Sequence, residues 1–420
     1  MKLIVDFVEE KADIWPLKQK KFTHYLHSDC SIKSLYDEFS KKEVLDITYN
    51  CFRCIFKKYC SHVEILKKGT EFCPVCYHFQ NRNSAEIEDG HELTNFERYE
   101  QHLQEARDAK LNYAQCQKLR KNNALVVSFD FKSSILLPCP LRKLASTNYN
   151  KKLKIDFFGI VPENRKMKPE YFLFDSLSEA KKFDMIATSL ILFCDRNLKC
   201  YDMLYIFCDN TVSQNKNRYI IALLGILRLK YNLSEIRLNF LVVGHTHMKA
   251  DQCFGKVQKC LGMIDLFVPQ HIAEIINRSH EVGNCYYVEN VMNFSKFFIN
   301  SEETKGITKV QTIVINYAGV YTSDVTLGQK KCNEKTKRKY WNINLPPLKE
   351  FNNFINSGDN FVKMKALSKK EIQEYVVSIP CFEGISNSDL NFYSLKLLQC
   401  CPLPNEVDFL AEMQKRLNQF

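Results

Sequence analysis

The chain has 420 residues, of which 45% are hydrophobic and 12% aromatic, so it can fill a substantial core and is expected to form two or three domains. No apolar run approaches the ~20 residues of a membrane span, and the charged start MKLIVDFVEEKADIW excludes a secretory signal, which indicates an intracellular protein without a membrane partner. The net charge of +11 favours a polyanionic partner, and 18 cysteines in a reducing compartment indicate buried thiols and a zinc site rather than disulfides.

Residues 1–121 are predicted to form a mainly helical N-terminal lobe. The segment SLYDEFSKKEVLD places Leu35, Phe39 and Leu45 on one side of a helix. Residues 92–121 are predicted to form one long charged helix, because their apolar side chains recur at helical spacing.

A cluster of cysteines lies between these two helices. Cys51-x2-Cys54 is followed after eighteen residues by Cys73-x2-Cys76, a spacing typical of a tetrahedral zinc site. The aromatic run YNCFRCIFKKY is also consistent with a buried helix whose thiols lie in a core. Other side chains that could complete the site are Cys60, His62, His78, His91 and His102. We expect a zinc ion, with Cys51, Cys54, Cys73 and Cys76 as its candidate ligands.

Residues 122–265 are predicted to form an α/β core with a mixed sheet flanked by helices. Strands are expected at 124–131, 153–161, 171–175, 203–208 and 237–243, and helices at 178–196, 216–231 and 249–262. The first three strands are close enough in sequence to form an antiparallel meander. Strands joined through helices must run parallel with right-handed crossovers, which predicts the strand order 3-2-1-4-5.

Residues 266–420 are predicted to form a C-terminal α+β lobe. A helix is expected to begin near Pro269, and two further helices are expected at 368–378 and 387–399. Strands are expected at 309–316 and 360–366.

Three aspartates follow the predicted inner strands. Asp130 lies on the first strand, Asp209 comes directly after the fourth, and Asp251 comes just after the fifth. In the order 3-2-1-4-5 the first and fourth strands are neighbours, and the turn at 244–251 brings the third acid to the same edge. Any one of these residues alone is better explained as a strand-end cap or a solvated loop residue, so the hypothesis depends on the three together.

Three neighbouring carboxylates repel one another, and divalent cations remove that repulsion. Hard oxygen ligands on a rigid sheet suit Mg²⁺ or Mn²⁺. Two such ions ~4 Å apart can activate an attacking water or 3′-hydroxyl and stabilise the leaving oxygen of a phosphodiester.

Polar side chains surround the predicted acids. Asn210, Gln214 and Asn215 follow the fourth strand and could hold phosphates, orient Asp209 or cap the next helix. His245 and His247 of the sequence GHTH are candidates for metal ligands, general acid–base groups or donors to carboxylates.

The stretches SFDF, FCDNTVSQNKN and VVGHTHMKADQCFGKV resemble an uncharacterised eukaryotic family of transposon-derived proteins. That family carries an RNase H-like domain of the DDE/DDD transposase and integrase type. The likeness extends to FTHYLHSDCSIKSLYDEF, CPVCYHF, HLQEA and LSKKEIQEYVVSIP, and so covers most of the chain. It implies Asp130, Asp209 and Asp251 as the metal-binding triad, with His245 and His247 beside the third acid. The third acid here is Asp rather than the commoner Glu.

The same resemblance stresses Cys73 and Cys76 as zinc ligands, together with a downstream histidine such as His102. It implies a polynucleotidyl transferase or nuclease that uses two divalent metals to cut or join DNA, or a domesticated descendant of such an enzyme. The implied partners are DNA and further copies in a homo-oligomer, and the implied location is the nucleus.

Two alternatives remain open at this point. The first is a catalytically silent nucleic-acid-binding or scaffold protein on the same fold. The second is a calcineurin-like metallophosphoesterase, because those enzymes end with a Gly-His-x-His similar to GHTH. They also need an Asp-x-His after the first strand and an Asn-His pair, whereas this chain has Asp130-Phe131-Lys132 and no Asn-His pair.

Overall fold

The computed structural model describes residues 2–14, 24–26, 30–42, 47–65, 73, 75–76, 92–119, 123–142, 151–164, 166–262, 264–279, 281–301, 304, 306–307, 310–322, 340–341, 343–378 and 385–400. The chain divides into two compact units. One, the N-terminal unit, comprises Met1–Leu119, Asn239–Lys249 and Asp324–Lys337. The other, the sheet unit, comprises Arg120–Leu238, Ala250–Ser323 and Arg338–Phe420.

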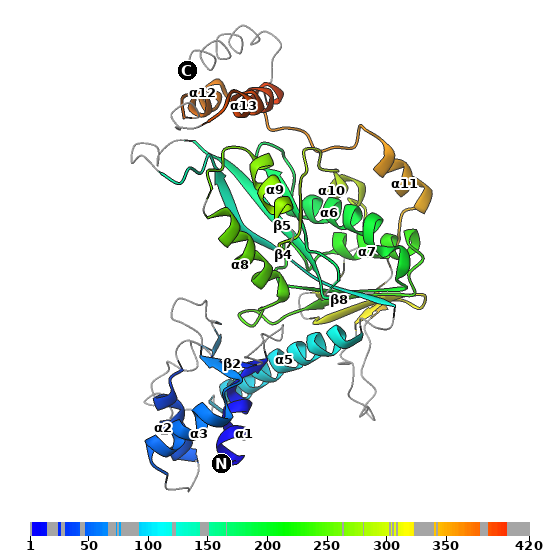
Figure 1. Ribbon diagram of the computed structural model, residues 1–420. Helices are drawn as coiled ribbons and strands as arrows, with labels where there is room; N and C mark the ends of the chain where they lie inside the picture. The colour runs from blue at the N-terminus through cyan, green and yellow to red at the C-terminus, as the bar shows by residue number, and fades with distance from the viewer. Residues whose placement is uncertain are drawn as a thin grey trace. The chain divides into compact units, whose positions relative to one another are not determined.

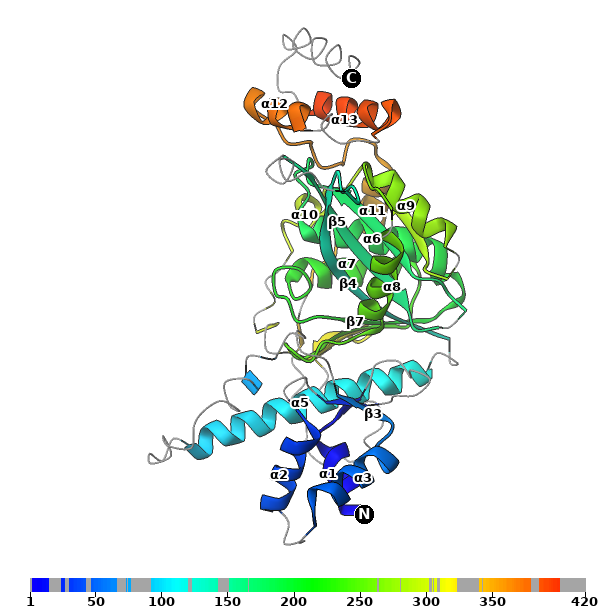
Figure 2. The ribbon, with the colours of Figure 1, turned by 60° about the vertical axis from the view of Figure 1, so that its left-hand side comes forward.

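The N-terminal unit contains a small helical module and one long helix (Figure 2). The module consists of α1 (Lys2–Lys11), α2 (Ile32–Lys42) and α3 (Tyr49–Tyr59), with the short strands β1 (Asp13–Ile14), β2 (His24–Leu26) and β3 (Val63–Ile65) in the order β1-β2-β3. Helix α3 begins where Thr48 accepts a hydrogen bond from the Cys51 amide. The rings of Phe7, Phe39 and Phe52 form the centre of the core of the module. The long helix is α5 (Glu92–Leu119).

The sheet unit is built on nine strands in the order β12-β11-β10-β8-β7-β4-β5-β6-β9. Their bounds are β4 (Ala124–Leu137), β5 (Leu153–Pro162), β6 (Glu170–Asp175), β7 (Met203–Cys208), β8 (Glu235–Phe240), β9 (Asn284–Tyr287), β10 (Thr312–Asn316), β11 (Gly319–Thr322) and β12 (Tyr340–Trp341). Strands β4, β5 and β6 form an antiparallel meander, whereas β4 pairs with β7, and β6 with β9, in parallel. The sheet is therefore mixed, and its inner strands are almost wholly buried.

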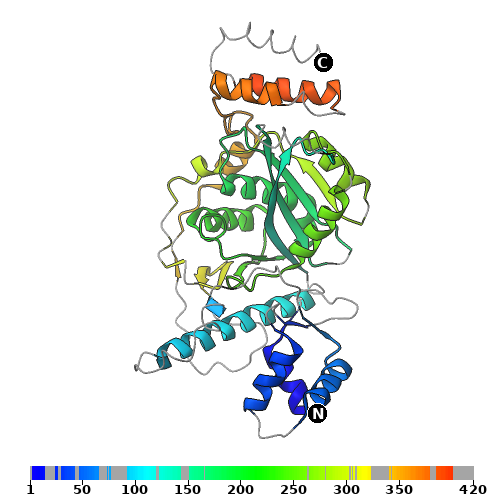
Figure 3. The same cartoon turned by 90° about the vertical axis from the view of Figure 1, so that its left-hand side faces the viewer.

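Helices cover both faces of this sheet (Figures 1 and 3). The helices of the unit are α6 (Lys182–Asn197), α7 (Arg218–Lys230), α8 (Lys249–Leu261), α9 (Pro269–Arg278), α10 (Phe294–Phe297), α11 (Leu348–Asn356), α12 (Lys369–Ser378) and α13 (Asn387–Gln399). Asp156 of β5 contacts Lys182 of α6, whereas the adjacent Phe157 contacts Phe254 of α8. Because successive strand residues face opposite sides of a sheet, α6 and α8 cover opposite faces.

A glycine allows α8 to approach the sheet closely. A Cβ added at Gly159 would lie 2.6 Å from the ring of Phe254, so any larger residue would push the helix away. The close contact holds α8 against β5 at Phe254.

The predicted mixed sheet flanked by helices is confirmed. The predicted separation of residues 266–420 as a lobe of their own differs from the structure, because β9 pairs with β6 and strands β10–β12 continue the sheet beyond β8. The strand predicted at 360–366 is reduced to isolated bridges at Phe361 and Met364. None of the helices in the described part of the chain has both the length and the apolar character that crossing a membrane requires.

Candidate functional site

Asp130 and Asp209 are brought together by the pairing of β4 with β7. These strands run parallel, with Val127 opposite Ile206 and Ser128 opposite Phe207. The same register continued by two residues places Asp130 opposite Asp209, directly after the end of β7. Paired residues of neighbouring strands project from the same face of a sheet, so the two carboxylates lie on one side.

Asp251 approaches the same side of the sheet from α8. Asp130 pairs with Gly159 on β5, and Gly159 faces Phe254 of α8. The face that carries Asp130 is therefore the face that α8 covers, and Asp251 lies in the first turn of that helix. The negative end of its side chain complements the positive N-terminal end of the helix dipole.

The three carboxylates affect one another electrostatically. Burial, followed by the charges of Asp209 and Asp251, raises the pKa of Asp130 to about 8. The Phe131 amide donates a hydrogen bond to Asp130 Oδ1 at 2.7 Å, which only partly offsets these effects. Without a cation, Asp130 is therefore protonated at neutral pH, which is the behaviour expected of crowded acids that lack a counter-charge.

Asp209 is held in place by its own turn. Thr211 Oγ1 donates a hydrogen bond to one carboxylate oxygen, and the buried Asn215 side chain donates to the other. Of the polar residues predicted near this acid, Asn215 therefore contacts it directly. Asn210 instead accepts a hydrogen bond from Lys216 Nζ at 2.7 Å, and Gln214 offers its backbone carbonyl to Asn217 at 3.1 Å.

Lys216 is a residue that the sequence did not single out. It is only 2% exposed, and burial lowers its pKa to about 8. The burial of Lys216 beside the turn of Asp209 could not be predicted from the sequence, because its neighbours in the sequence are polar residues typical of an exposed loop.

A second group of potential ligands lies within the N-terminal unit. Cys73, Cys76, His102 and His245 offer one ligand atom each, and these atoms all lie within 4.8 Å of one another. Cys73 Sγ is 3.1 Å from His102 Nε2, and Cys76 Sγ is 3.4 Å from His245 Nε2. Among the described residues, no other group of three or more Cys, His, Asp or Glu side chains has all its ligand atoms within 4.8 Å of one another. The carboxylate oxygens of the three aspartates therefore lie farther apart than the ligand atoms of this cluster.

The chemistry of this cluster fits a zinc ion. Tetrahedral zinc with Zn–S of about 2.3 Å and Zn–N of about 2.0 Å requires sulfur and nitrogen ligands to lie roughly 3.5 Å apart. The two observed sulfur–nitrogen distances are close to this value. A hydrogen bond from Cys76, aided by those from the two histidines and opposed by burial, lowers the pKa of Cys73, which favours the thiolate that binds metal.

A tight turn delivers His245 to the cysteines. The His245 amide donates to the Val242 carbonyl at 2.9 Å, and the intervening Gly244 has a φ of 78°. A Cβ at Gly244 would lie 2.4 Å from Cys73 Cα, so this position requires glycine for both its backbone conformation and its contact.

Helix α5 supplies His102 and also holds the segment that contains His245. Lys110 Nζ donates to the His247 carbonyl at 2.5 Å, and Tyr113 OH accepts from the Lys249 amide at 3.2 Å. Two residues after Lys110 on α5, the Asn112 side chain donates to the Asn239 side chain at 3.1 Å. Both ends of residues 239–249 are thus fixed to one helix.

These contacts correct part of the predicted zinc site. Cys51 and Cys54 are exposed on α3 and lie outside the cluster, because this helix buries Phe52 and Phe56 instead. His102 joins Cys73 and Cys76 as expected, and His245 completes the set.

The other candidate ligands have different surroundings or are not described. Cys60 is buried in the core of the helical module, and His62 contacts Glu9 at 2.9 Å. His78 and His91 lie outside the described residues. His247 contributes its backbone carbonyl to a contact with Lys110.

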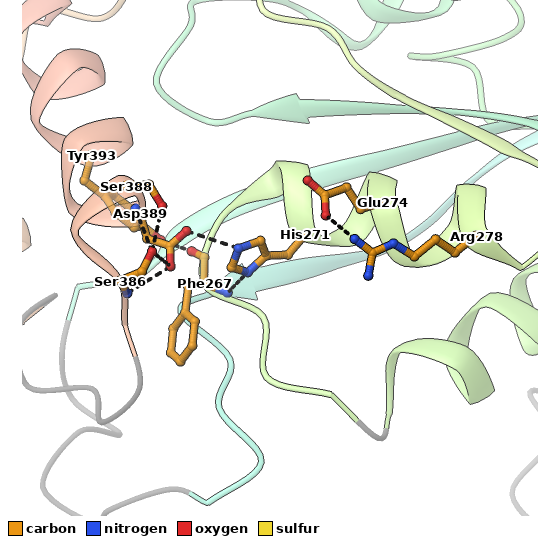
Figure 4. Close-up of polar contacts among 8 residues, drawn as sticks. All are labelled: Phe267, His271, Glu274, Arg278, Ser386, Ser388, Asp389 and Tyr393. Atoms are coloured by element: carbon orange, nitrogen blue, oxygen red, sulfur yellow. Dashed lines mark hydrogen bonds and ion pairs between the residues drawn. The ribbon is translucent and has the colours of Figure 1, made fainter.

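A serine, a histidine and an aspartate also meet between α9 and α13 (Figure 4). His271 Nε2 lies 3.1 Å from Asp389, and its Nδ1 accepts from the Phe267 amide at 3.4 Å. Ser386 Oγ donates to Asp389 at 2.8 Å rather than contacting the imidazole. Both ring nitrogens of His271 are therefore engaged elsewhere and the serine lacks a base, so this group caps α13 and holds it against α9.

A family described as a domain of unknown function (DUF7869) matches residues 145–334. The matched stretch includes Asp209, His245 and Asp251, whereas Asp130, Cys73 and Cys76 precede it. No curated protein and no solved structure is significantly similar to the chain.

Proposed function

We propose that the protein is a metal-dependent DNA nuclease or strand transferase of the RNase H-like, transposase type. Asp130, Asp209 and Asp251 would be its metal ligands. The observation that carries the proposal is the parallel register of β4 and β7, which sets two of these acids side by side on the face from which α8 brings the third.

The arrangement of strands supports the RNase H-like interpretation. Strands β6, β5, β4, β7 and β8 are consecutive in the sheet. This succession corresponds to the order 3-2-1-4-5 predicted from the sequence pattern, with acids on the first strand, after the fourth and at the start of the helix after the fifth. The additional strands lie outside these five and leave the acids in the middle of the sheet.

The three carboxylates suit hard divalent cations such as Mg²⁺ or Mn²⁺, because a bound cation would attract each carboxylate and so offset their mutual repulsion. When bound, two such ions supply activation of the attacking oxygen and stabilisation of the leaving oxygen of a phosphodiester. The residues of the chain orient these ligands. Asn215 and Thr211 fix both oxygens of Asp209, and Asp130 must release its proton before it can bind a cation.

Zinc would have a structural role in the same protein. Cys73, Cys76, His102 and His245 form a closed set of four protein ligands, which leaves no open position for a substrate. Zinc held there would stabilise the turn at Gly244 and the anchoring of residues 239–249 to α5. The position of His245 among cysteines also argues against a metallophosphoesterase, in which this histidine would bind a catalytic metal.

A nicking assay on supercoiled plasmid DNA in the presence of Mn²⁺ tests the catalytic proposal. We expect Asp130→Asn and Asp209→Asn to lose at least ~100-fold in rate, because each removes a charged ligand from the transition-state environment. Asp359→Asn is the matched control, since Asp359 is an exposed aspartate in the same unit. Equal rates in all four proteins, or an inactive wild-type protein that still binds DNA, would refute catalysis and favour a silent DNA-binding protein on this fold.

The proposal also gives a location and an assembly state to test. A protein that acts on chromosomal DNA must reach the nucleus, which imaging of a tagged full-length chain would determine. Cutting both ends of a DNA segment would require a homo-oligomer, which light scattering in the presence of DNA would detect.

A further inference from the structure

Helix α3 carries a cationic surface that the proposed catalytic and zinc sites do not use. Its sequence, YNCFRCIFKKY, contains three basic residues and no acidic residue. Its exposed residues include Asn50, Arg53, Cys54, Lys57 and Lys58. We call this set the α3 face.

The spacing of the α3 face places it on one side of the helix. Its members occur at positions i, i+3, i+4, i+7 and i+8, which lie within about 140° of one another at 100° per residue. The opposite side carries Phe52 and Phe56, which are buried in the core of the helical module, and Phe52 packs against Phe39. The core therefore fixes which side of α3 faces outward.

The α1 and α2 helices of the module each carry both basic and acidic residues, whereas α3 carries only basic ones. The acids of α2 are already paired, since Asp37 contacts Lys33 and Glu38 contacts Lys11. Within the described part of the chain, Arg53, Lys57 and Lys58 form no ion pair with a carboxylate, and Lys58 instead lies 5.3 Å from the ring of Tyr59. The cations of α3 are thus left to an external anion.

We infer that the α3 face docks into the major groove of B-form DNA, an inference that rests on the proposed action on DNA. An α-helix fits the width of that groove, where Asn and Arg side chains can reach base edges and Lys side chains can reach phosphates. The order of Asn50, Arg53 and Lys57 along the face is compatible with the first two reading bases and the third contacting the backbone.

The same observations disfavour two other polyanions. A helix that binds a membrane inserts its apolar side into the lipid, whereas the apolar side of α3 is buried in the protein core. The major groove of A-form RNA is too deep and narrow to admit a helix. Duplex DNA is therefore the occupant that matches both the shape and the charge of this surface.

Fluorescence anisotropy with a labelled DNA duplex and the full-length protein tests the inference. Arg53→Ala/Lys57→Ala should weaken binding roughly 10- to 100-fold and lower the slope of log Kd against log salt by about 1 to 2. The control Lys2→Ala/Lys41→Ala removes the same charge from exposed positions on α1 and α2 and should retain nearly full affinity. Equal losses in both variants would mean that only net charge matters, and an unaffected α3 variant would likewise overturn the docking surface.

Cys54 provides a second readout that needs no substitution. Its thiol is exposed in the middle of the α3 face, and Cys200 of the sheet unit is an exposed reference. With DNA at about ten times Kd, alkylation of Cys54 by a maleimide should become roughly tenfold slower, while Cys200 keeps its rate. Unchanged alkylation of Cys54, or equal protection by an RNA duplex or by anionic vesicles, would contradict docking of B-form DNA.

The two proposals can fail separately. Asp130→Asn should still bind DNA and protect Cys54 while losing cleavage, because the substitution lies outside the N-terminal unit. Protection without any wild-type cleavage would reject the catalytic proposal alone. Cleavage that survives without protection of Cys54 would reject the α3 face alone.

Discussion

His245 Nε2 lies 3.4 Å from Cys76 Sγ, although 169 positions separate the two residues along the chain. Cys76 belongs to a short CxxC segment, and His245 belongs to the loop that follows β8. A contact over this sequence distance closes a large loop, and a strong interaction at this point would offset part of the closure entropy. A metal ion that binds all four ligands of the cluster would provide one.

Removal of the His245 side chain should therefore release zinc. We expect His245→Ala to reduce bound zinc from about one equivalent to less than half, because three ligands remain and the affinity falls by more than the 10- to 100-fold typical of supporting residues. His247→Ala is the matched control, since its backbone carbonyl contacts Lys110 and survives the substitution. Metal analysis of the purified proteins measures both. Full zinc content in His245→Ala would rule out this residue as a ligand.

Gly244 should tolerate no side chain. A Cβ there would lie 2.4 Å from Cys73 Cα, and the φ of 78° is unfavourable for alanine. Gly244→Ala should therefore lose zinc and lower the thermal unfolding midpoint.

Gly255 offers the opposite control, because nothing lies within 4 Å of an added Cβ at this exposed position of α8. Gly255→Ala should stabilise the protein by about 0.5 to 1 kcal/mol through its higher helix propensity. Calorimetry on both variants gives the comparison. A Gly244→Ala protein as stable and zinc-rich as the wild type would show that the turn is not needed for the cluster.

Local patterns in the sequence were sufficient to predict most of the sheet unit. The helix predicted at 249–262 is α8 (Lys249–Leu261), and the helix expected to begin near Pro269 is α9 (Pro269–Arg278). The predicted strand at 203–208 is β7 (Met203–Cys208). These elements have long periodic patterns or clear start signals, so neighbouring residues alone determine them.

The missed features depend on distant contacts. Strands β9, β11 and β12 have four, four and two residues, and such short strands at or near the sheet edges form only because a neighbouring strand offers hydrogen bonds. The pattern Cys51-x2-Cys54 suggested zinc ligands. The burial of Phe52 and Phe56 instead sets the orientation of α3 and leaves both cysteines exposed. His245 could not be assigned to the cysteines from sequence, because its segment reaches them only through the fold.

The crowded acids predict a conflict between stability and function. Because the pKa of Asp130 is raised to about 8, well above the value of about 4 in the unfolded chain, the metal-free native state loses stability as the pH rises from about 4 and bears the full cost above about 8. Asp130→Asn removes this charge. Without metal, the variant should unfold roughly 2 to 4 °C higher than the wild type at pH 9, by a smaller margin at pH 6, and at nearly the same temperature near pH 4. Thermal scans with a chelator present measure this difference, and a variant that is less stable at pH 9 would show that the three acids do not repel.

A second buried aspartate predicts the reverse dependence on pH. Burial raises the pKa of Asp156, but hydrogen bonds from Lys182 at 2.9 Å and Ser134 at 2.8 Å outweigh it, so the net pKa is lowered. The ionised carboxylate therefore stabilises the folded state above the unfolded pKa of about 4, and this contribution is lost as the pH falls through the lower folded value.

Asp156→Asn should thus destabilise the protein at pH 7 by about 1 to 2 kcal/mol, a value reduced by the partial exposure of Lys182. The difference should begin to shrink below about pH 4 and should vanish once the folded wild-type carboxyl is also protonated at a lower pH. Urea unfolding of both proteins at pH 7 and at the lowest pH that retains the fold measures the change. Lys182→Met in the same background should add little further loss at pH 7, because the ion pair is already absent. A full additional loss would mean that Lys182 acts through its contact with the ring of Phe131, 4.1 Å away, rather than through Asp156.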